Sequence, residues 1–250
     1  MHPYFHVFGL TLPAYGTMIA LALLAAGTLG FFRTKKYAVS ADDALIVSAC
    51  AVGIGYLCAK LLFLVLTFPP AELVSRLKAG DVSMLNGGFV YYGGLIGGVL
   101  GALLGLRIAG CPAVPMLRAL LPVLPLAHAI GRIGCFLSGC CYGRLYSGPF
   151  AVPCPIDPSL TCFPVQPAEA LWNLLIFAVL LRADRRLRSP AALPALYAAL
   201  YAAGRFALEF FRGDADRGLW NGFSTSQWIS IAVFLLSLTF FLAAYKKDRS

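Results

Sequence analysis

The feature that most constrains this chain is a series of apolar segments long enough to cross a lipid bilayer. Hydrophobic residues make up 60% of the 250 residues and charged residues 12%, whereas soluble domains carry about 45–50% and about 25%. A membrane-spanning helix needs about 20 mostly apolar residues in a row. The sequence therefore excludes a soluble globular enzyme, a disordered chain and a coiled coil, and it predicts a polytopic membrane protein of the all-α class.

Seven such segments are predicted, within one integral membrane domain over residues 1–250 that shows no tandem repeat. The first is not expected to be a cleaved signal peptide, because no basic residue precedes it. The segments run from about Leu12 to Phe32, Ala44 to Phe68, Gly88 to Arg107, Pro115 to Leu137, Ala168 to Leu181, Ala191 to Phe211 and Gln227 to Tyr245.

The basic residues predict how these segments are oriented. With seven spans, 12 of the 20 Lys and Arg residues fall on the side that holds the C-terminus, five fall on the other side and three lie inside spans. Because cytoplasmic loops are enriched in Lys and Arg, the C-terminus is expected in the cytoplasm and the N-terminus outside. The net charge of +9 does not indicate nucleic-acid binding, since most basic residues follow apolar segments directly.

Three cations are predicted inside the membrane, namely Lys60, Arg132 and Arg205, against the acids Glu209 and Glu169. Each buried cation needs a partner or a polar cavity. The positive surplus favours an anionic ligand, and a phospholipid phosphate suits the two-oxygen fork of arginine. The structural alternatives are an Arg205–Glu209 pair at i, i+4 and a Lys60 side chain that extends to the membrane surface.

The segment around Arg132 carries a distinctive motif, Gly-Arg-x-Gly-x-Phe-x-x-Gly-x-x-x-Gly, over residues 131–143. It resembles the signature of the prolipoprotein diacylglyceryl transferases, and the resemblance extends over almost the whole chain. Further matching motifs are Tyr15-Gly16, Gly87-Gly88-Phe89, Gly93-Gly94-Leu95-Ile96-Gly97, Glu209-Phe210-Phe211-Arg212 followed by Asp214, and Ser226-Gln227.

The sequence also departs from the family pattern. Tyr92 stands where the family usually has His, and Cys135, Ser138 and Cys140 stand where it usually has Asn, Asn and Glu. The family stretch His-Pro-x-Gln-Leu-Tyr-Glu corresponds here to residues 166–172. The chain thus resembles a divergent branch in which both signature arginines, Arg132 and Arg212, are kept.

The resemblance implies an enzyme that transfers diacylglyceryl from phosphatidylglycerol to the thiol of a lipobox cysteine in an exported prolipoprotein. Arg132 and Arg212 are the implied catalytic cations, because negative charge builds on the departing phosphate. Tyr92 is the third implied catalytic residue, and His128 is either a substitute base or a packing residue. The implied substrate-binding residues are Tyr15, Gly16, Gly93, Gly94, Cys135, Gly143 and Glu209.

The resemblance also implies a multi-pass protein of the bacterial inner membrane. Its partners would be phosphatidylglycerol, prolipoprotein lipobox peptides and membrane lipids, without nucleic acid and without a cofactor. Two alternatives remain open: a lipid-binding or transport paralogue that has lost the reaction, and a membrane thiol-redox protein.

Five of the eight cysteines cluster at or beyond the outer end of the fourth segment. Disulfides are allowed on that side of the membrane, and Cys154 and Cys162 enclose a seven-residue loop that is a plausible disulfide loop. With five cysteines, at least one thiol stays free. No metal site is expected, because there is no C-x-x-C pair and no nearby His except His128. The outer cysteines are expected to have structural roles.

Overall fold

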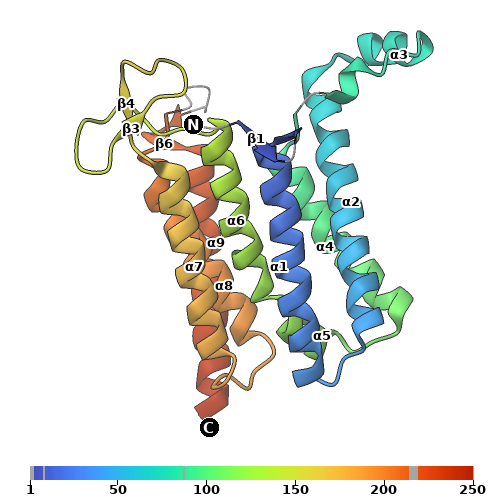
Figure 1. Cartoon of the computed structure of the whole chain (residues 1–250). Coiled ribbons are helices and arrows are strands. Elements are labelled where there is room, and N and C mark those ends of the chain that lie inside the picture. Colours follow the sequence, from blue (N-terminus) through green and yellow to red (C-terminus); the bar gives the residue numbers. More distant parts are fainter. Residues whose placement is uncertain (1–2, 8, 87, 214–218, 250) are drawn as a thin grey trace. The chain divides into compact units, whose positions relative to one another are not determined.

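A computed structural model describes residues 3–7, 9–86, 88–213 and 219–249, and within these ranges helices dominate (Figure 1). The predicted all-α class is confirmed, because every strand belongs to a short two-stranded antiparallel hairpin. Gly87 and Asp214, which belong to matched motifs, lie outside the described residues. The helices are α1 (Ala14–Lys36), α2 (Ala41–Thr67), α3 (Pro70–Lys78), α4 (Tyr91–Ala109), α5 (Ala113–Leu120), α6 (Val123–Ser138), α7 (Val165–Ala183), α8 (Ala192–Glu209) and α9 (Thr225–Arg249), and a short 3-10 turn covers Ser83–Asn86.

Six helical segments of the described chain are long and apolar enough to cross a membrane. They are α1, α2, α4, the α5–α6 segment (Ala113–Ser138), α7, and α9 over Thr225–Lys246. The sixth predicted segment forms α8, which is helical over 18 residues but contains Arg205 and Glu209. The multi-pass membrane character is thus confirmed, whereas the number of spans and the orientation of the termini stay predictions.

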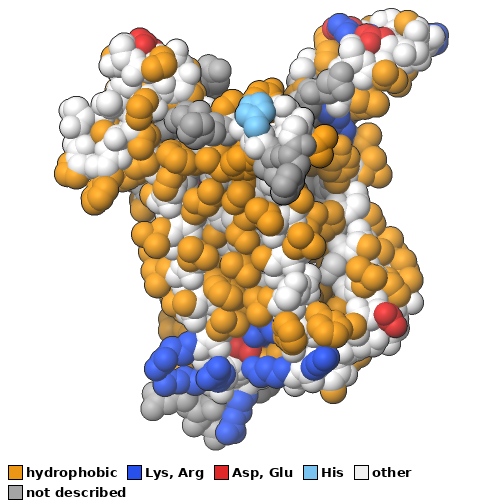
Figure 2. All heavy atoms as spheres, viewed as in Figure 1, with side chains coloured by type: hydrophobic (Ala, Val, Ile, Leu, Met, Phe, Trp, Pro, Cys, Tyr) orange, Lys and Arg blue, Asp and Glu red, His pale blue; other side chains and the backbone are white. Residues whose placement is uncertain are grey.

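The chain divides into two compact units, one formed by residues 31–117 and the other by residues 1–30 and 118–250. The single domain predicted from the sequence stays a prediction. Large hydrophobic side chains are exposed along the helices of both units, among them Leu66 in the smaller unit and Leu171 in the larger one, and Figure 2 shows how densely such side chains cover the helices. Exposed apolar flanks are expected where helices face lipid.

In the smaller unit, α2 and α4 pack closely because α4 presents a stripe of glycines. Gly93, Gly97, Gly101 and Gly105 are all buried. A Cβ atom on Gly101 would lie 2.3 Å from the carbonyl oxygen of Cys50 on α2. Small residues at every fourth position let two helix backbones approach each other in a membrane. Packing against α2 therefore accounts for the glycine richness of this segment.

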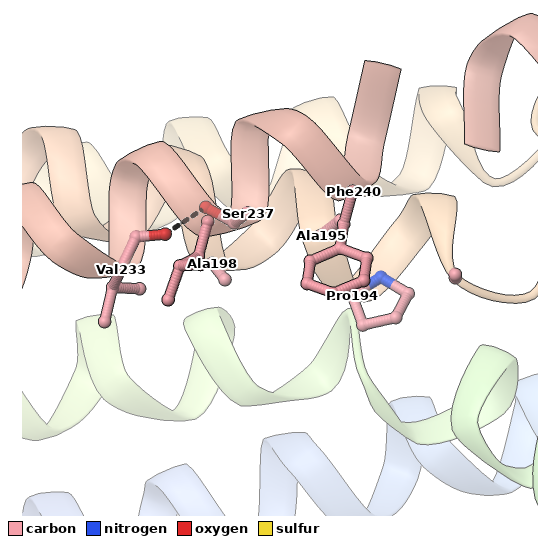
Figure 3. Close-up of a pocket in the computed structure, with 8 residues that line it drawn as sticks. Pro194, Ala195, Ala198, Val233, Ser237 and Phe240 are labelled. Carbon is pink, nitrogen blue, oxygen red and sulfur yellow. Dashed lines mark hydrogen bonds between the residues drawn. The ribbon is translucent and has the colours of Figure 1, made fainter. Parts of the chain in front are cut away.

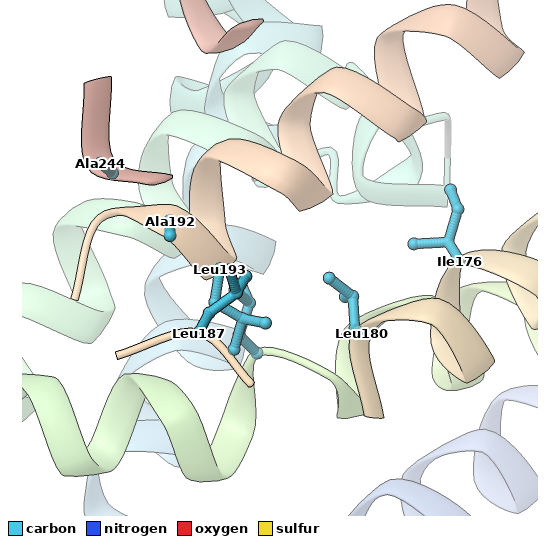
Figure 4. Packing of buried hydrophobic residues seen from close by; sticks show 7 residues of the cluster. Ile176, Leu180, Leu187, Ala192, Leu193 and Ala244 are labelled. Atoms are coloured by element: carbon cyan, nitrogen blue, oxygen red, sulfur yellow. The ribbon is translucent and has the colours of Figure 1, made fainter. Parts of the chain in front are cut away.

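In the larger unit, the core lies between α7, α8, α9 and the α7–α8 connection. Ile176 and Leu180 of α7 pack with Leu193 of α8 and Leu187 of the connection, and Ala244 closes the cluster from α9 (Figure 4). Ile176, Leu180 and Leu193 are at most 1% exposed. Burying each such side chain stabilises a fold by about 1.5–3 kcal/mol in water, and in the membrane this core fixes the helices that carry the charged residues described below.

The fourth predicted segment is interrupted, because α5 ends at Leu120 and α6 begins at Val123. Pro122 lies in the gap. Proline lacks a backbone N–H, and its ring clashes with the carbonyl four residues earlier, so it breaks a helix. The stretch Ala113–Ser138 is nonetheless long and apolar enough to cross a membrane as one segment, in agreement with the predicted span from about Pro115 to Leu137.

Three hairpins lie between the helices: β1 (Tyr4–Val7) with β2 (Leu10–Pro13), β3 (Val152–Pro153) with β4 (Thr161–Cys162), and β5 (Leu219–Trp220) with β6 (Phe223–Ser224). A disulfide joins Cys154 to Cys162, with 5.2 Å between their Cα atoms. This confirms the predicted disulfide loop. Within the loop, Ser159 donates hydrogen bonds to Asp157 from its backbone and hydroxyl groups, which lower the pKa of that carboxyl.

An open apolar pocket of about 340 Å³ lies between α8 and α9 (Figure 3). Its lining includes Pro194, Ala198, Val233 and Phe240, and its one polar side chain, Ser237, already donates a hydrogen bond to the Val233 carbonyl at 2.6 Å. The pocket occupies the N-terminal half of α8, away from the charged end of that helix. It offers no polar group to orient a headgroup, so the functional site is elsewhere.

Candidate active site

Five charged side chains come together at one end of the helices of the larger unit. Arg132 belongs to α6, Glu169 to α7, and Arg205 and Glu209 to α8, while Arg212 follows α8 by three residues. Arg132, Glu169 and Glu209 are each 8% exposed. Buried charges persist in proteins when they are paired and hydrogen-bonded, and these five residues pair with one another.

Glu169 is the centre of this network, because its carboxylate contacts all three arginines. Its Oε2 atom pairs with Arg132 Nε. Its Oε1 atom lies 3.4 Å from Arg205 Nη1 and 3.5 Å from Arg212 Nη1. One carboxylate thus holds three guanidinium groups that would otherwise repel one another.

Glu209 forms the second anchor of the network. Its Oε2 atom lies 2.6 Å from Arg205 Nη2, which confirms the i, i+4 pair considered from the sequence. The Ser224 hydroxyl donates to Glu209 Oε1 at 2.8 Å. Ser224 and Gln227 also form a reciprocal capping box at the start of α9, because each backbone N–H is bound by the other's side chain. The start of α9 therefore fixes the hydroxyl that orients Glu209.

The network carries a formal surplus of one positive charge, since three arginines face two carboxylates. Arg132 Nη2 is buried and has no hydrogen-bond partner among the described residues. Gln227 Nε2 is a second buried donor that has no hydrogen-bond partner among the described residues. Because an unsatisfied buried donor is costly, these donors favour an anionic ligand, as the surplus of intramembrane cations predicted.

The two signature motifs meet in this region. Gly143 forms a β-bridge with Arg212, and Gly213 N–H donates to the Tyr142 carbonyl at 3.1 Å. A Cβ atom on Gly143 would lie 2.2 Å from the Phe163 carbonyl oxygen and 2.9 Å from that of Phe211. Only glycine allows this approach, so Gly143 acts by bringing the segment that carries Arg212 beside the segment that follows α6.

Three free cysteines lie next to Arg132. The Sγ atoms of Cys135, Cys140 and Cys141 are all within 4.8 Å of one another. Arg132 Nη1 donates to Cys135 Sγ at 3.7 Å, and Gln166 Nε2 donates to the Cys140 carbonyl at 2.7 Å. The three thiols therefore adjoin the arginine network at Arg132, which belongs to the same chain segment.

The environment of Cys141 favours its thiolate form. Interaction with the Cys135 and Cys140 thiols holds the pKa of the Cys141 thiol well below its usual range, and the charges of Arg132 and Arg212 act in the same direction. A lowered thiol pKa beside cations is typical of reactive or metal-binding cysteines.

The other site residues predicted from the sequence fall into two groups. Tyr15 lies in the larger unit, and a Cβ on Gly134 of α6 would lie 3.4 Å from its ring, so Tyr15 packs beside the signature segment. Gly16 follows it on α1 near Pro13. Tyr92, Gly93 and Gly94 belong to α4 in the smaller unit. Gly93 is tightly packed against the Cys58 carbonyl of α2, and the catalytic role of Tyr92 stays a prediction.

The His128 ring lies against the Tyr201 ring at 5.7 Å, an aromatic contact that agrees with a packing role. Lys60 of the smaller unit donates to the Gly88 carbonyl at 3.4 Å and lies 4.8 Å from the centre of the Phe89 ring. These two residues are thus accommodated by local contacts within their own units.

Sequence reasoning missed the importance of Glu169, Arg205, Gln166 and Ser224. Glu169 and Arg205 were noted as intramembrane charges but not assigned to the site. Their rarity in apolar segments is the signal that identifies them, because ionisable residues inside membranes are functional candidates by default. Gln166 and Ser224 gave no comparable signal.

The fold and the site define an α-helical polytopic membrane protein with a buried arginine cluster suited to an anion. The chain belongs to the prolipoprotein diacylglyceryl transferase family, whose sequence model matches residues 3–243. It is 34% identical over 244 residues to the phosphatidylglycerol–prolipoprotein diacylglyceryl transferase of Clostridium tetani, with 95% of each chain covered. Similar enzymes of that name from Clostridium perfringens and Dehalococcoides mccartyi are 30% and 31% identical, over 92% and 98% of this chain and 90% and 94% of theirs. The chain is thus a transferase of this family.

Proposed function

We propose that this chain transfers the diacylglyceryl group of phosphatidylglycerol to a cysteine thiol of exported prolipoproteins. The observation that carries the proposal is the buried network around Glu169, with its positive surplus and the unpaired Nη2 donor of Arg132. A phosphodiester supplies one negative charge and two free oxygens. It would therefore balance the surplus positive charge and accept a hydrogen bond from Arg132 Nη2.

The reaction places negative charge where the arginines lie. The acceptor thiolate attacks the glycerol carbon that bears the phosphate, a C–S bond forms, and the C–O bond to phosphate breaks. Glycerol phosphate leaves with a second negative charge. Fixed cations in a water-poor site stabilise such developing charge strongly. We assign this role to Arg132 and Arg212, with Glu169 and Glu209 as positioning residues that hold the guanidinium planes.

The site is also placed suitably for exported substrates. The network lies toward the ends of α6 and α8 and the starts of α7 and α9, next to the loops predicted to face outside. We propose that the protein resides in the bacterial inner membrane and binds lipobox peptides at this outer side. The Cys154–Cys162 disulfide in an adjoining loop supports the assignment, because disulfides persist outside the cytoplasm.

The test is transfer of labelled diacylglyceryl from phosphatidylglycerol to a lipobox peptide by purified protein in detergent. We expect Arg132→Lys to lower the rate about 10²–10³-fold, because lysine keeps the charge but cannot offer the planar two-donor fork. The matched control is Arg185→Lys at an exposed arginine outside the network. Equal rates in both variants would remove Arg132 from the mechanism, and lipid binding without any transfer by the wild type would favour the non-catalytic paralogue instead.

A further inference from the structure

The strongest unassigned feature is the cluster formed by Cys135, Cys140 and Cys141. Their sulfur atoms lie within 4.8 Å of one another, and no other set of three metal-ligating side chains comes as close in the described part of the chain. Cys135 is buried, Cys141 is half-buried and Cys140 is exposed. The cluster is therefore closed on one side and accessible on another.

The backbone is shaped to bring these thiols together. Gly139 adopts a left-handed conformation with φ +75°, and it donates to the Phe136 carbonyl while Cys140 donates to the Cys135 carbonyl. This Schellman motif folds the chain back over the last turn of α6. Cys141 is then left-handed as well, with φ 57°, which is uncommon outside glycine and asparagine. Such strain is typical of functional sites.

The surrounding charge suits a metal thiolate. Three thiolates around one Zn²⁺ would carry a formal charge of only −1, against −3 without the metal, and the Arg132 guanidinium lies beside them. Arg132 already donates from Nη1 to Cys135 Sγ, and such outer hydrogen bonds orient metal ligands. Glu169 does not compete as a ligand, because its oxygens are engaged by three arginines.

We propose that Cys135, Cys140 and Cys141 bind a zinc ion, whose fourth position, on the side of exposed Cys140, takes the acceptor thiol of the prolipoprotein. In a tetrahedral site with Zn–S bonds of about 2.3 Å, sulfurs lie about 3.8 Å apart, so the thiols need to close by no more than about 1 Å. Three protein ligands and one open position are the usual pattern of a catalytic rather than a structural zinc. The identity of the fourth ligand rests on the proposed function.

The chemistry balances without any further reactant. The acceptor thiol binds zinc and releases its proton to water, because a coordinating thiol is deprotonated. The bound thiolate supplies the electron pair of the new C–S bond, and the electron pair of the broken C–O bond leaves with glycerol phosphate. Zinc keeps its charge throughout, and its three protein thiolates stay in place. The sequence analysis leads to a structural role for these cysteines and to no metal, and the proposed zinc site departs from both expectations.

Metal binding is measured first, on the full chain in detergent, independently of transfer. Wild-type protein isolated with zinc should retain about one Zn²⁺ per chain after gel filtration. Cys141→Ser should lower the affinity for Zn²⁺ more than about tenfold, since even outer-shell changes reach that size. The matched control is Cys111→Ser, at a free thiol of the smaller unit, which should retain zinc like the wild type. Circular dichroism establishes that each variant is folded.

The open position is tested with Co²⁺ in place of zinc. The wild type should show the visible bands of tetrahedral Co²⁺ and a thiolate charge-transfer band. Adding a peptide with the acceptor cysteine should strengthen the charge-transfer band, whereas the same peptide with serine should leave it unchanged. Because no diacylglyceryl donor is present, this result does not depend on the transfer reaction.

The outcomes separate the two proposals. Transfer by a metal-free wild type at the full rate, or a disulfide between any two of the three cysteines in zinc-supplemented protein, would overturn the zinc site and leave the transferase function standing. Stoichiometric zinc lost in Cys141→Ser, without any transfer by the wild type, would support the site and contradict the function.

Discussion

At the residue scale, the carboxylate of Glu169 holds three guanidinium groups of like charge close together. At about 4 Å, two unit charges interact by about 4 kcal/mol when the effective dielectric constant is near 20. Without the carboxylate, the mutual repulsion of Arg132, Arg205 and Arg212 would be uncompensated on that side. Glu169 therefore allows three cations to stay close to one another, where a single anionic substrate can reach them.

Glu169→Gln removes this charge with little change in shape, and we expect it to destabilise the fold by about 3–5 kcal/mol, the usual cost of breaking a buried ion pair. Transfer should fall as well, because the guanidinium planes lose their common anchor. Thermal unfolding in detergent and the transfer assay measure the two effects. The matched control is Glu72→Gln in α3, an exposed pair with Arg76 that should leave the unfolding temperature unchanged. Equal behaviour of the two variants would contradict the central role of Glu169.

At the element scale, the site depends on how tightly the loops after α6 and α8 approach each other. Arg144 N–H donates to the Phe211 carbonyl at 2.9 Å, and Phe163 N–H donates to the Arg144 carbonyl at 3.0 Å. The Phe163 and Phe211 rings stack with centroids 4.5 Å apart. These contacts join the two signature motifs into one layer over the arginine network.

Gly143→Ala should disrupt this layer, because the new methyl group would meet two backbone carbonyl oxygens that cannot rotate away. We expect a loss of about 1–3 kcal/mol in stability, as for an overpacked core, together with slower transfer. Gly131→Ala is the control within the same motif, since its methyl would meet only Ile19 Cδ1 at 3.7 Å. Unfolding curves that coincide for the two variants would rule out the close approach at Gly143.

At the scale of the whole molecule, the sequence predicted those features of the fold and the site that depend on hydropathy and charge. The apolar segments became helices, the Arg205–Glu209 pair formed at its helical spacing, and the Cys154–Cys162 loop closed. Arg132 and Arg212, the arginines of the two motifs, also lie in one network, and that network carries the predicted surplus of positive charge. Each of these features depends on local spacing or on the cost of a charge in the membrane.

The remaining features depend on contacts between segments distant in sequence. The role of Glu169 required α7 to face both α6 and α8, which no local pattern specifies. The cysteine cluster required two left-handed residues after α6, and a search for C-x-x-C spacing passes over such a turn. The break at Pro122 was visible in the sequence, but Pro115 and Pro125 in the same segment lie within helices, so proline alone did not decide it.

Whether α8 crosses the membrane with its charged end determines the topology of the whole chain. If α8 crosses the membrane despite Arg205 and Glu209, the chain has seven spans, and a C-terminus opposite the N-terminus follows. The Arg205–Glu209 ion pair lowers the free-energy cost of this crossing, because Arg205 is neutralised within its own helix. The cluster of Arg182, Arg185, Arg186 and Arg188 after α7 should then stay in the cytoplasm together with the C-terminus.

Reporter fusions in a bacterial host measure this topology. Alkaline phosphatase joined after Ser159 should be active, whereas phosphatase joined after Arg188 or after the last residue should be inactive, and a fluorescent protein at the C-terminus should fluoresce. With an outside N-terminus, six spans would reverse the C-terminal results alone, because only the segments after Arg188 would change sides. An active phosphatase at the C-terminus, with an inactive one after Arg188, would place Glu209 and Arg212 on the cytoplasmic side, opposite the loop that follows α6. That result would remove the basis of the proposed site.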